Sequence, residues 1–381
     1  MCSTISVNTL GKQNSRWPVL ILFFGLILAG LGAGAADAEP FGTAGFLTGD
    51  GSATALASGS TKADETTLGA QQVPTPKPRA PEVGKPSTDP PRVSSKQWVW
   101  LQIALGAAVV GCLWFGNVIK PSSLGQSGGK GGGKGGDGAG GSDRPWWAFL
   151  FAAVVIYLAM GVGAEAINSQ IRLNASWLGG VTAGSTKGNS IAMLGQGFAG
   201  LIAGFAMLAL ASGGLKRPTW KDLGIGLLAI VVALPVVNAT GLVALEIYRA
   251  FKESSPPTIG HNTLQTISDS RSDPWAWTQA AAAILITPIV EELIYRYFLQ
   301  SALVRAFKRA WLGVLVTAAL FAAAHIGAVP SETLSTVLPV LFVLGLALGI
   351  AMQRTGKLSV PIVMHAMFNA VNVAMTIWLN K

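Results

Sequence analysis

The feature that most constrains this chain is a series of apolar segments that are each about as long as a lipid bilayer is thick. A transmembrane helix needs about 20 mostly apolar residues, and half of this 381-residue chain is hydrophobic while 12% is charged. Because backbone groups in lipid must be paired within helices or closed barrels, we predict an all-α fold, a polytopic transmembrane helix bundle. About eight candidate spans follow a signal-like start, at 98–119, 146–167, 190–212, 222–247, 275–303, 311–328, 333–353 and 358–379.

The amino-terminal part has a different composition. Residues 1–38 contain the apolar run Trp17–Ala36 followed by the small-x-small sequence Ala36-Asp37-Ala38, which predicts a signal peptide or an uncleaved signal anchor. Residues 39–96 are rich in Gly, Ser, Thr and Pro, with too little periodic apolar content for a core. We therefore expect a disordered extracytoplasmic tether there.

The rest of the chain divides in three. A transmembrane helix is expected at 97–120, and a Gly-rich flexible linker at 121–145. The membrane helix bundle then occupies 146–381, with its catalytic core at about 275–379.

Loop charges orient the predicted spans. Lys and Arg residues favour the cytoplasmic side of short loops, and they gather here in loops that alternate along the chain: 130–144, 216–221, 305–309 and 354–357. The loop at Ser331-Glu332 has neither residue. The net charge of +9 is thus a topology signal, and because no basic-aromatic stripe or nucleic-acid motif is present we expect no nucleic-acid partner.

Four polar side chains on three of these spans point to chemistry. Glu291, His325, His365 and Asn369 all lie within apolar segments, where polar groups are costly and usually functional. At a rise of 1.5 Å per residue they lie roughly 10–20 Å from the cytoplasmic ends of their helices. We therefore expect them in one layer, somewhat to the cytoplasmic side of the bilayer centre, facing one cavity open to the cytoplasm or to lipid.

The spacing of their neighbours adds detail. Glu292 and Arg296 are four residues apart on one helix face and can form an ion pair. Phe321 lies one turn before His325 and would pack beside it. Each feature alone has a structural explanation, namely helix packing for the ion pair, a satisfied core histidine, and interhelical hydrogen bonding for the asparagine.

The combination favours acyl hydrolysis. A carboxylate and an imidazole in a low-dielectric pocket can hold and deprotonate a water molecule. A second imidazole with a carboxamide can donate hydrogen bonds to a developing oxyanion. Both devices are present in this set.

Three motifs resemble one known family. Glu291-Glu292-x-x-x-Arg296, Phe321-x-x-x-His325 and His365-x-x-x-Asn369 are similar to the motifs of the CPBP family of intramembrane proteases, that is, the CAAX prenyl proteases and the bacteriocin-processing, Abi-type proteins. The resemblance covers about 275–379. It implies that Glu291 and His325 activate the water.

The resemblance also assigns the other motif residues. It implies that His365 and Asn369 form the oxyanion hole, and that Glu292 and Arg296 order the helix that carries Glu291. The family is named for metalloprotease activity, and two His with one Glu are a possible zinc set. The chain has no His-Glu-x-x-His sequence, so the need for a metal cofactor stays open.

The leading hypothesis is an intramembrane endopeptidase that acts on a peptide or membrane-protein substrate among membrane lipids. The signal-like start and Gly-rich linker indicate a multi-pass protein of the bacterial inner membrane. Two alternatives remain, a non-catalytic scaffold or immunity protein of the same fold and a proton-coupled transporter. The second would require inverted repeats, which the sequence does not contain.

Overall fold

The computed structural model describes residues 95–124, 144–173, 176–211, 215–252 and 260–379. The predicted signal segment, nearly all of the tether and most of the Gly-rich linker lie outside these residues. Within them the only regular elements are helices: α2 (Ser95–Phe115), α3 (Pro121–Leu124), α4 (Trp146–Arg172), α5 (Thr186–Ala211), α6 (Trp220–Lys252), α7 (Asn262–Asp269), α8 (Pro274–Glu292), α9 (Gln300–Phe307), α10 (Ala310–Ala324), α11 (Leu334–Thr355) and α12 (Ser359–Leu379). A π-helix, η2 (Leu293–Leu299), joins α8 to α9, and short 3₁₀ turns lie at Ser176–Leu178, Ile326–Ala328 and Ser331–Thr333.

Seven helical segments in the described part of the chain are long and apolar enough to cross a membrane. They comprise α2, α4, α5, α6, α11 and α12, together with α10 and its following turn. The continuous unit α8–η2–α9 carries Glu291, Glu292 and Arg296 and supplies a further long helix through the bundle. The prediction of an all-α polytopic bundle is therefore confirmed.

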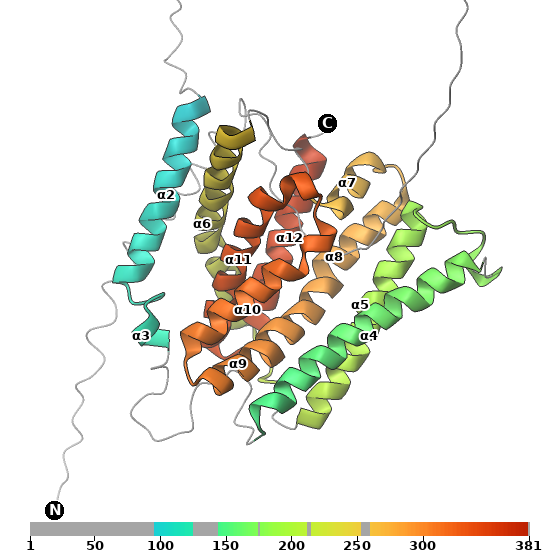
Figure 1. Ribbon diagram of the computed structural model, residues 1–381, viewed down its shortest axis with the longest axis horizontal. Helices are drawn as coiled ribbons and strands as arrows, with labels where there is room; N and C mark the ends of the chain where they lie inside the picture. Colours follow the sequence, from blue (N-terminus) through green and yellow to red (C-terminus); the bar gives the residue numbers. More distant parts are fainter. Residues whose placement is uncertain (1–94, 125–143, 174–175, 212–214, 253–259, 380–381) are drawn as a thin grey trace, which may run out of the picture.

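Figure 1 shows how the helices are arranged. α2 packs on α6 at one flank, and α4 packs on α5 at the opposite flank. Between them, α8 contacts both α5 and α12, while α11 lies between α6 and α10. The motif-bearing helices thus lie between the two flanking pairs, although Leu285 of α8 and Leu320 of α10 stay exposed on the outer surface.

Helix ends follow local chemistry. The side chain of Asp273 accepts a hydrogen bond from the Trp275 backbone N–H, with Pro274 at the first helical position, so α8 has a good start signal. α11 ends at Gly356, whose φ of +60° suits a residue without a side chain and whose N–H bonds back to Met352.

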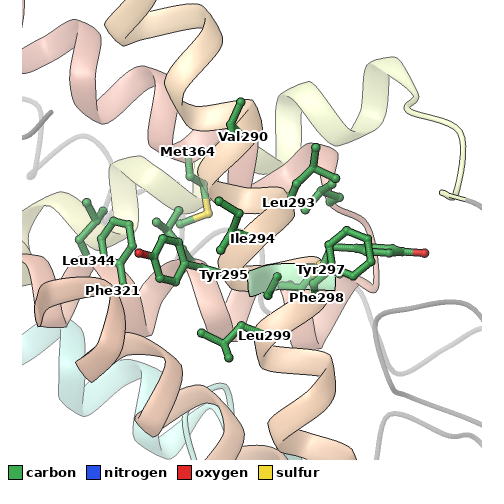
Figure 2. Close-up of a cluster of buried hydrophobic side chains, with 14 of the residues drawn as sticks. Val290, Leu293, Ile294, Tyr295, Tyr297, Phe298, Leu299, Phe321, Leu344 and Met364 are labelled. Atoms are coloured by element: carbon green, nitrogen blue, oxygen red, sulfur yellow. The ribbon is translucent and has the colours of Figure 1, made fainter. Parts of the chain in front are cut away.

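The π-helix η2 anchors the hydrophobic core. All seven of its residues are buried. Figure 2 shows Tyr295 pointing toward Phe321, whereas Tyr297 and Phe298 point to the other side of the helix. One helix thereby packs aromatic rings in two directions, which fixes its rotation within the bundle.

Polar contacts link the helix ends on each side of the bundle. At one end, called the basic end, Arg305 donates to the Arg144 carbonyl, Trp311 donates to the Ile119 carbonyl, and Lys357 pairs with Asp222 at 2.6 Å. These contacts gather the loops that the sequence assigns to the cytoplasm.

At the other end, called the distal end, Thr186 bonds to Ser270 and Arg271 donates to the Ile377 carbonyl. By the positive-inside rule we expect the basic end in the cytoplasm and the distal end outside.

Candidate active site

Glu291 lies near the middle of the unit α8–η2–α9, in the last turn of α8. Its side chain is 3% exposed. One carboxylate oxygen, Oε2, has no hydrogen-bond partner in the described structure. Glu291 also contributes to the wall of a cavity of about 510 Å³. An ionisable group that is buried, incompletely paired and adjacent to a cavity is well placed to act on a bound molecule.

Glu292 points into the protein and forms a buried network. Its Oε2 pairs with Nε of Arg296 at 3.2 Å, and its Oε1 accepts a hydrogen bond from Nδ1 of His365 at 2.9 Å. Glu292 and Arg296 are both 0% exposed. The predicted pair is confirmed, and its role is to compensate two charges that would otherwise be costly in the interior.

His365 bridges the two carboxylates. While Nδ1 donates to Glu292, Nε2 lies 3.8 Å from Oε2 of Glu291. Both ring nitrogens are therefore directed at carboxylates, and the hydrogen bond to Glu292 links α12 to the end of α8.

Phe321 connects the parts of the network. Its ring centroid lies 4.8 Å from that of His325 and 5.8 Å from that of His365, and the Arg296 guanidinium lies 4.7 Å from the ring. Tyr295 meets the same ring edge-on at 5.2 Å. The predicted packing of Phe321 against His325 is confirmed, and the cation–π contact adds a second support for Arg296.

His325 is the residue that follows α10, and one of its ring nitrogens forms a hydrogen bond with the helix backbone. Its Nδ1 lies 2.7 Å from the Phe321 carbonyl oxygen. Since a carbonyl only accepts, Nδ1 carries a proton, and in the neutral ring Nε2 holds the lone pair. His325 shares the wall of the cavity with Glu291. Two of the predicted catalytic residues, from different helices, thus face one space.

Asn369 faces elsewhere. Its Nδ2 donates to the Ala283 carbonyl on α8 at 2.9 Å, and its Oδ1 has no partner in the described structure. Neither Asn369 nor His365 is part of the cavity wall. In this conformation the two residues predicted to form the oxyanion hole are outside the cavity wall. The Asn369 amide instead links α12 to α8.

The cavity extends from Glu291 toward the distal end, and the predicted opening to the cytoplasm or to lipid stays a prediction. The lining residues come from the distal halves of α4, α5 and α8, from α7, from η2 and from the turn after α10: Tyr157, Met160, Gly161, Ala164, Glu165, Asn168, Asn189, Ala192, Met193, Gln196, Asn262, Thr263, Thr266, Gln279, Glu291, Ile294, Tyr295, Ala324, His325, Gly327 and Ala328. α10 ends at Ala324, and the turn that follows it contributes His325, Gly327 and Ala328 to this wall.

Two residues of this region were not predicted. His261 is 1% exposed and caps α7, its Nδ1 accepting from the Thr263 N–H. Burial lowers the pKa of His261 well below its usual range, and the charge of nearby His325 lowers it further. Gln279 lines the cavity at 5% exposure. Neither residue lies in a motif. Their positions depend on how α7 and α8 pack in the bundle, so only a structure identifies them.

The arrangement does not match a three-ligand metal centre. Within the described residues, no three His, Cys, Asp or Glu side chains are placed to hold one ion. We therefore derive no catalytic step through a metal.

Comparison with known proteins supports the resemblance seen in the motifs. Residues 273–371 match the family model described as Rce1-like, type II CAAX prenyl endopeptidase. The matched segment contains all seven motif residues, from Glu291 to Asn369. No curated protein and no solved structure matches the chain. The predicted relation to the CAAX protease family is thus confirmed by this segment.

Proposed function

We propose that this multi-pass membrane protein is an intramembrane endopeptidase of the CAAX type, which hydrolyses a peptide bond in a peptide or membrane-protein substrate. The observation that carries the proposal is that Glu291 and His325, which lie on separate helices of the segment similar to CAAX endopeptidases, line one cavity. A location in a bacterial cell membrane is part of the same proposal.

The chemistry follows from the two side chains at the cavity. A water molecule held between the Glu291 carboxylate and Nε2 of His325 loses a proton to the carboxylate as its oxygen attacks the scissile carbonyl carbon. The carbonyl oxygen becomes an oxyanion. When the C–N bond breaks, the proton moves from Glu291 to the leaving nitrogen, so no proton is gained or lost overall.

The remaining motif residues support Glu291. The His365–Glu292 hydrogen bond and the Arg296–Glu292 ion pair hold the end of α8 that carries Glu291, where a one-ångström displacement of the reacting group would be costly. Oxyanion stabilisation by His365 and Asn369 is part of the proposal. It requires the Asn369 amide to exchange the Ala283 carbonyl for the substrate oxyanion during the reaction.

The test is cleavage of a quenched fluorescent peptide library by the purified full-length protein in lipid nanodiscs. We expect Glu291→Gln and His325→Ala to lower kcat by at least about 100-fold, the usual range for general acid–base groups. Glu246→Gln is the matched control, because Glu246 is exposed, pairs with Arg249 and does not line the cavity. Each protein is also assayed with chelator, and activity restored by zinc would show a metal requirement.

The competing interpretation is a non-catalytic scaffold of the same fold. It is favoured by the position of Asn369, whose donor is already occupied in this conformation. A wild-type protein that binds peptides from the library and cleaves none of them would replace the endopeptidase proposal with this one.

A further inference from the structure

The cavity beside Glu291 has a lining suited to peptide main chain. Besides Thr263 and Thr266, its wall presents several carboxamides, which can both donate and accept hydrogen bonds: Asn168, Asn189, Gln196, Asn262 and Gln279. An isoprenoid chain offers no hydrogen bonds to such groups and would leave them unpaired at a substantial cost. An extended peptide offers an N–H and a C=O at every residue.

Gln279 gives the most direct sign of a missing partner. Its side chain is 5% exposed, it lines the cavity, and its Oε1 has no hydrogen-bond partner in the described structure. A buried acceptor left unpaired is costly, and the group that satisfies it must be a donor. The N–H of a bound peptide is such a donor, whereas a lipid chain is not.

The distance from Gln279 to the proposed catalytic group fits a short stretch of peptide. The two residues lie twelve positions apart on α8, or about 18 Å along the axis. An extended chain rises about 3.3 Å per residue, so roughly five residues span the interval. A peptide bond at Glu291 and a main-chain N–H at Gln279 can therefore belong to one substrate strand.

The side of entry follows from which helix ends form the wall. Asn168 lies near the distal end of α4, Asn189 near the distal start of α5, and Thr266 on α7 between the distal ends of α6 and α8. Toward the basic end, the interior below Glu291 is filled by the buried side chains of Arg296, Phe298 and Gln300. The cavity therefore leads away from the cytoplasmic loops.

We propose that this cavity takes an unlipidated, extended peptide segment from the extracytoplasmic side, and that Oε1 of Gln279 accepts a hydrogen bond from its main chain. The proposal rests on the proposed function for the chemistry at Glu291, and it narrows the substrate class. It makes Gln279 a substrate-binding residue about five residues from the cleaved bond.

The side of entry is tested by thiol labelling, which needs no catalysis. In a Cys2→Ser/Cys112→Ser background, Thr266→Cys reports on the cavity and Arg309→Cys on the basic end. We expect a membrane-impermeant maleimide to label Thr266→Cys in right-side-out vesicles and Arg309→Cys only in inverted vesicles. Labelling of Thr266→Cys only in inverted vesicles would overturn the proposal.

Peptide binding is tested by protection of the same thiol. We expect an unmodified decapeptide pool to slow labelling of Thr266→Cys at least fivefold, and the same pool carrying a C-terminal farnesyl-cysteine to protect no better. Adding Gln279→Leu should raise the half-protecting concentration about tenfold. Gln265→Leu is the matched control, since Gln265 is exposed on α7 and pairs with Asp269.

The outcomes separate the two proposals. Protection that depends on the farnesyl group, or that is equal in Gln279→Leu and Gln265→Leu, would refute the substrate assignment. Protection as expected without any cleavage of the pool by the wild-type protein would leave the peptide site standing and remove the endopeptidase proposal.

Discussion

Breaking the Glu292–Arg296 pair gives the sharpest test of the buried network. The change is Arg296→Met, which keeps most of the side-chain volume and removes the charge. Both partners are 0% exposed and their charged atoms lie 3.2 Å apart. Removing one member of a buried pair costs about 3–5 kcal/mol, because the other charge is left uncompensated. The loss of the guanidinium over Phe321, 4.7 Å from the ring, acts in the same direction.

The double variant Glu292→Gln/Arg296→Met should recover much of this loss. The carboxamide oxygen introduced by Glu292→Gln can still accept a hydrogen bond from Nδ1 of His365, and neither member of the former pair then carries an unpaired buried charge. We expect the double variant to be at least about 2 kcal/mol more stable than the sum of the two single changes. The assay is reversible unfolding in mixed detergent micelles, followed by far-ultraviolet circular dichroism.

An exposed pair provides the control. Glu246 and Arg249 lie 3.1 Å apart with side chains 45% and 41% exposed, and a surface pair contributes about 0–1 kcal/mol. The corresponding variants should therefore change stability little. Strict additivity of the Glu292 and Arg296 changes, or a cost of Arg296→Met no larger than the control, would refute the argument.

Three further predictions concern packing, catalysis and pH. Gly106→Ala should destabilise the protein by about 1–3 kcal/mol, because its new methyl group would lie 2.4 Å from a side chain of α6, whereas Gly111→Ala meets nothing within 4 Å and should be neutral or stabilising in the same unfolding assay. Asn369→Ala should lower kcat with little change in KM if its amide serves the oxyanion, whereas equal changes in stability and activity would indicate only its contact with α8. The pKa of His261 is lower in the folded than in the unfolded state. Below about pH 6.5, therefore, the unfolded chain binds a proton that the folded chain does not bind. The free energy of unfolding should decrease there by up to about 1.4 kcal/mol for each unit by which the pH is lowered. His261→Gln should flatten that dependence, and an unchanged slope would contradict it.

The sequence predicted the helices better than their relative orientation. Hydropathy locates a span because the bilayer requires a long apolar run, so the predicted segment 358–379 and helix α12 (Ser359–Leu379) nearly coincide. The i,i+4 spacing likewise predicted the Glu292–Arg296 pair, since both residues belong to one helix. The helical rise predicts only how deep a residue lies along its own helix. It does not predict how neighbouring helices are rotated and tilted relative to one another.

That missing information explains the differences at the site. From sequence, His365 and Asn369 share a face of α12, but which groups this face meets depends on how α12 packs on α8. In the structure it meets Glu292 and the Ala283 carbonyl. Gln279 could not be selected from sequence either, because its importance comes from a cavity bounded by helices distant in the chain.

The π-helix after Glu292 has a consequence for chain length. A π-helical turn bonds residue i to i+5 and so holds one residue more than an α-helical turn. Deleting a single residue within η2 should let the segment regularise into an α-helix while keeping α8 in place. Because only the extra residue of the π-helical turn is removed, α9 should keep its face, and Gln300 its hydrogen bond to the Gly349 carbonyl on α11. The segment between Glu291 and the loop after α9 should thus tolerate one deletion within η2 better than an insertion.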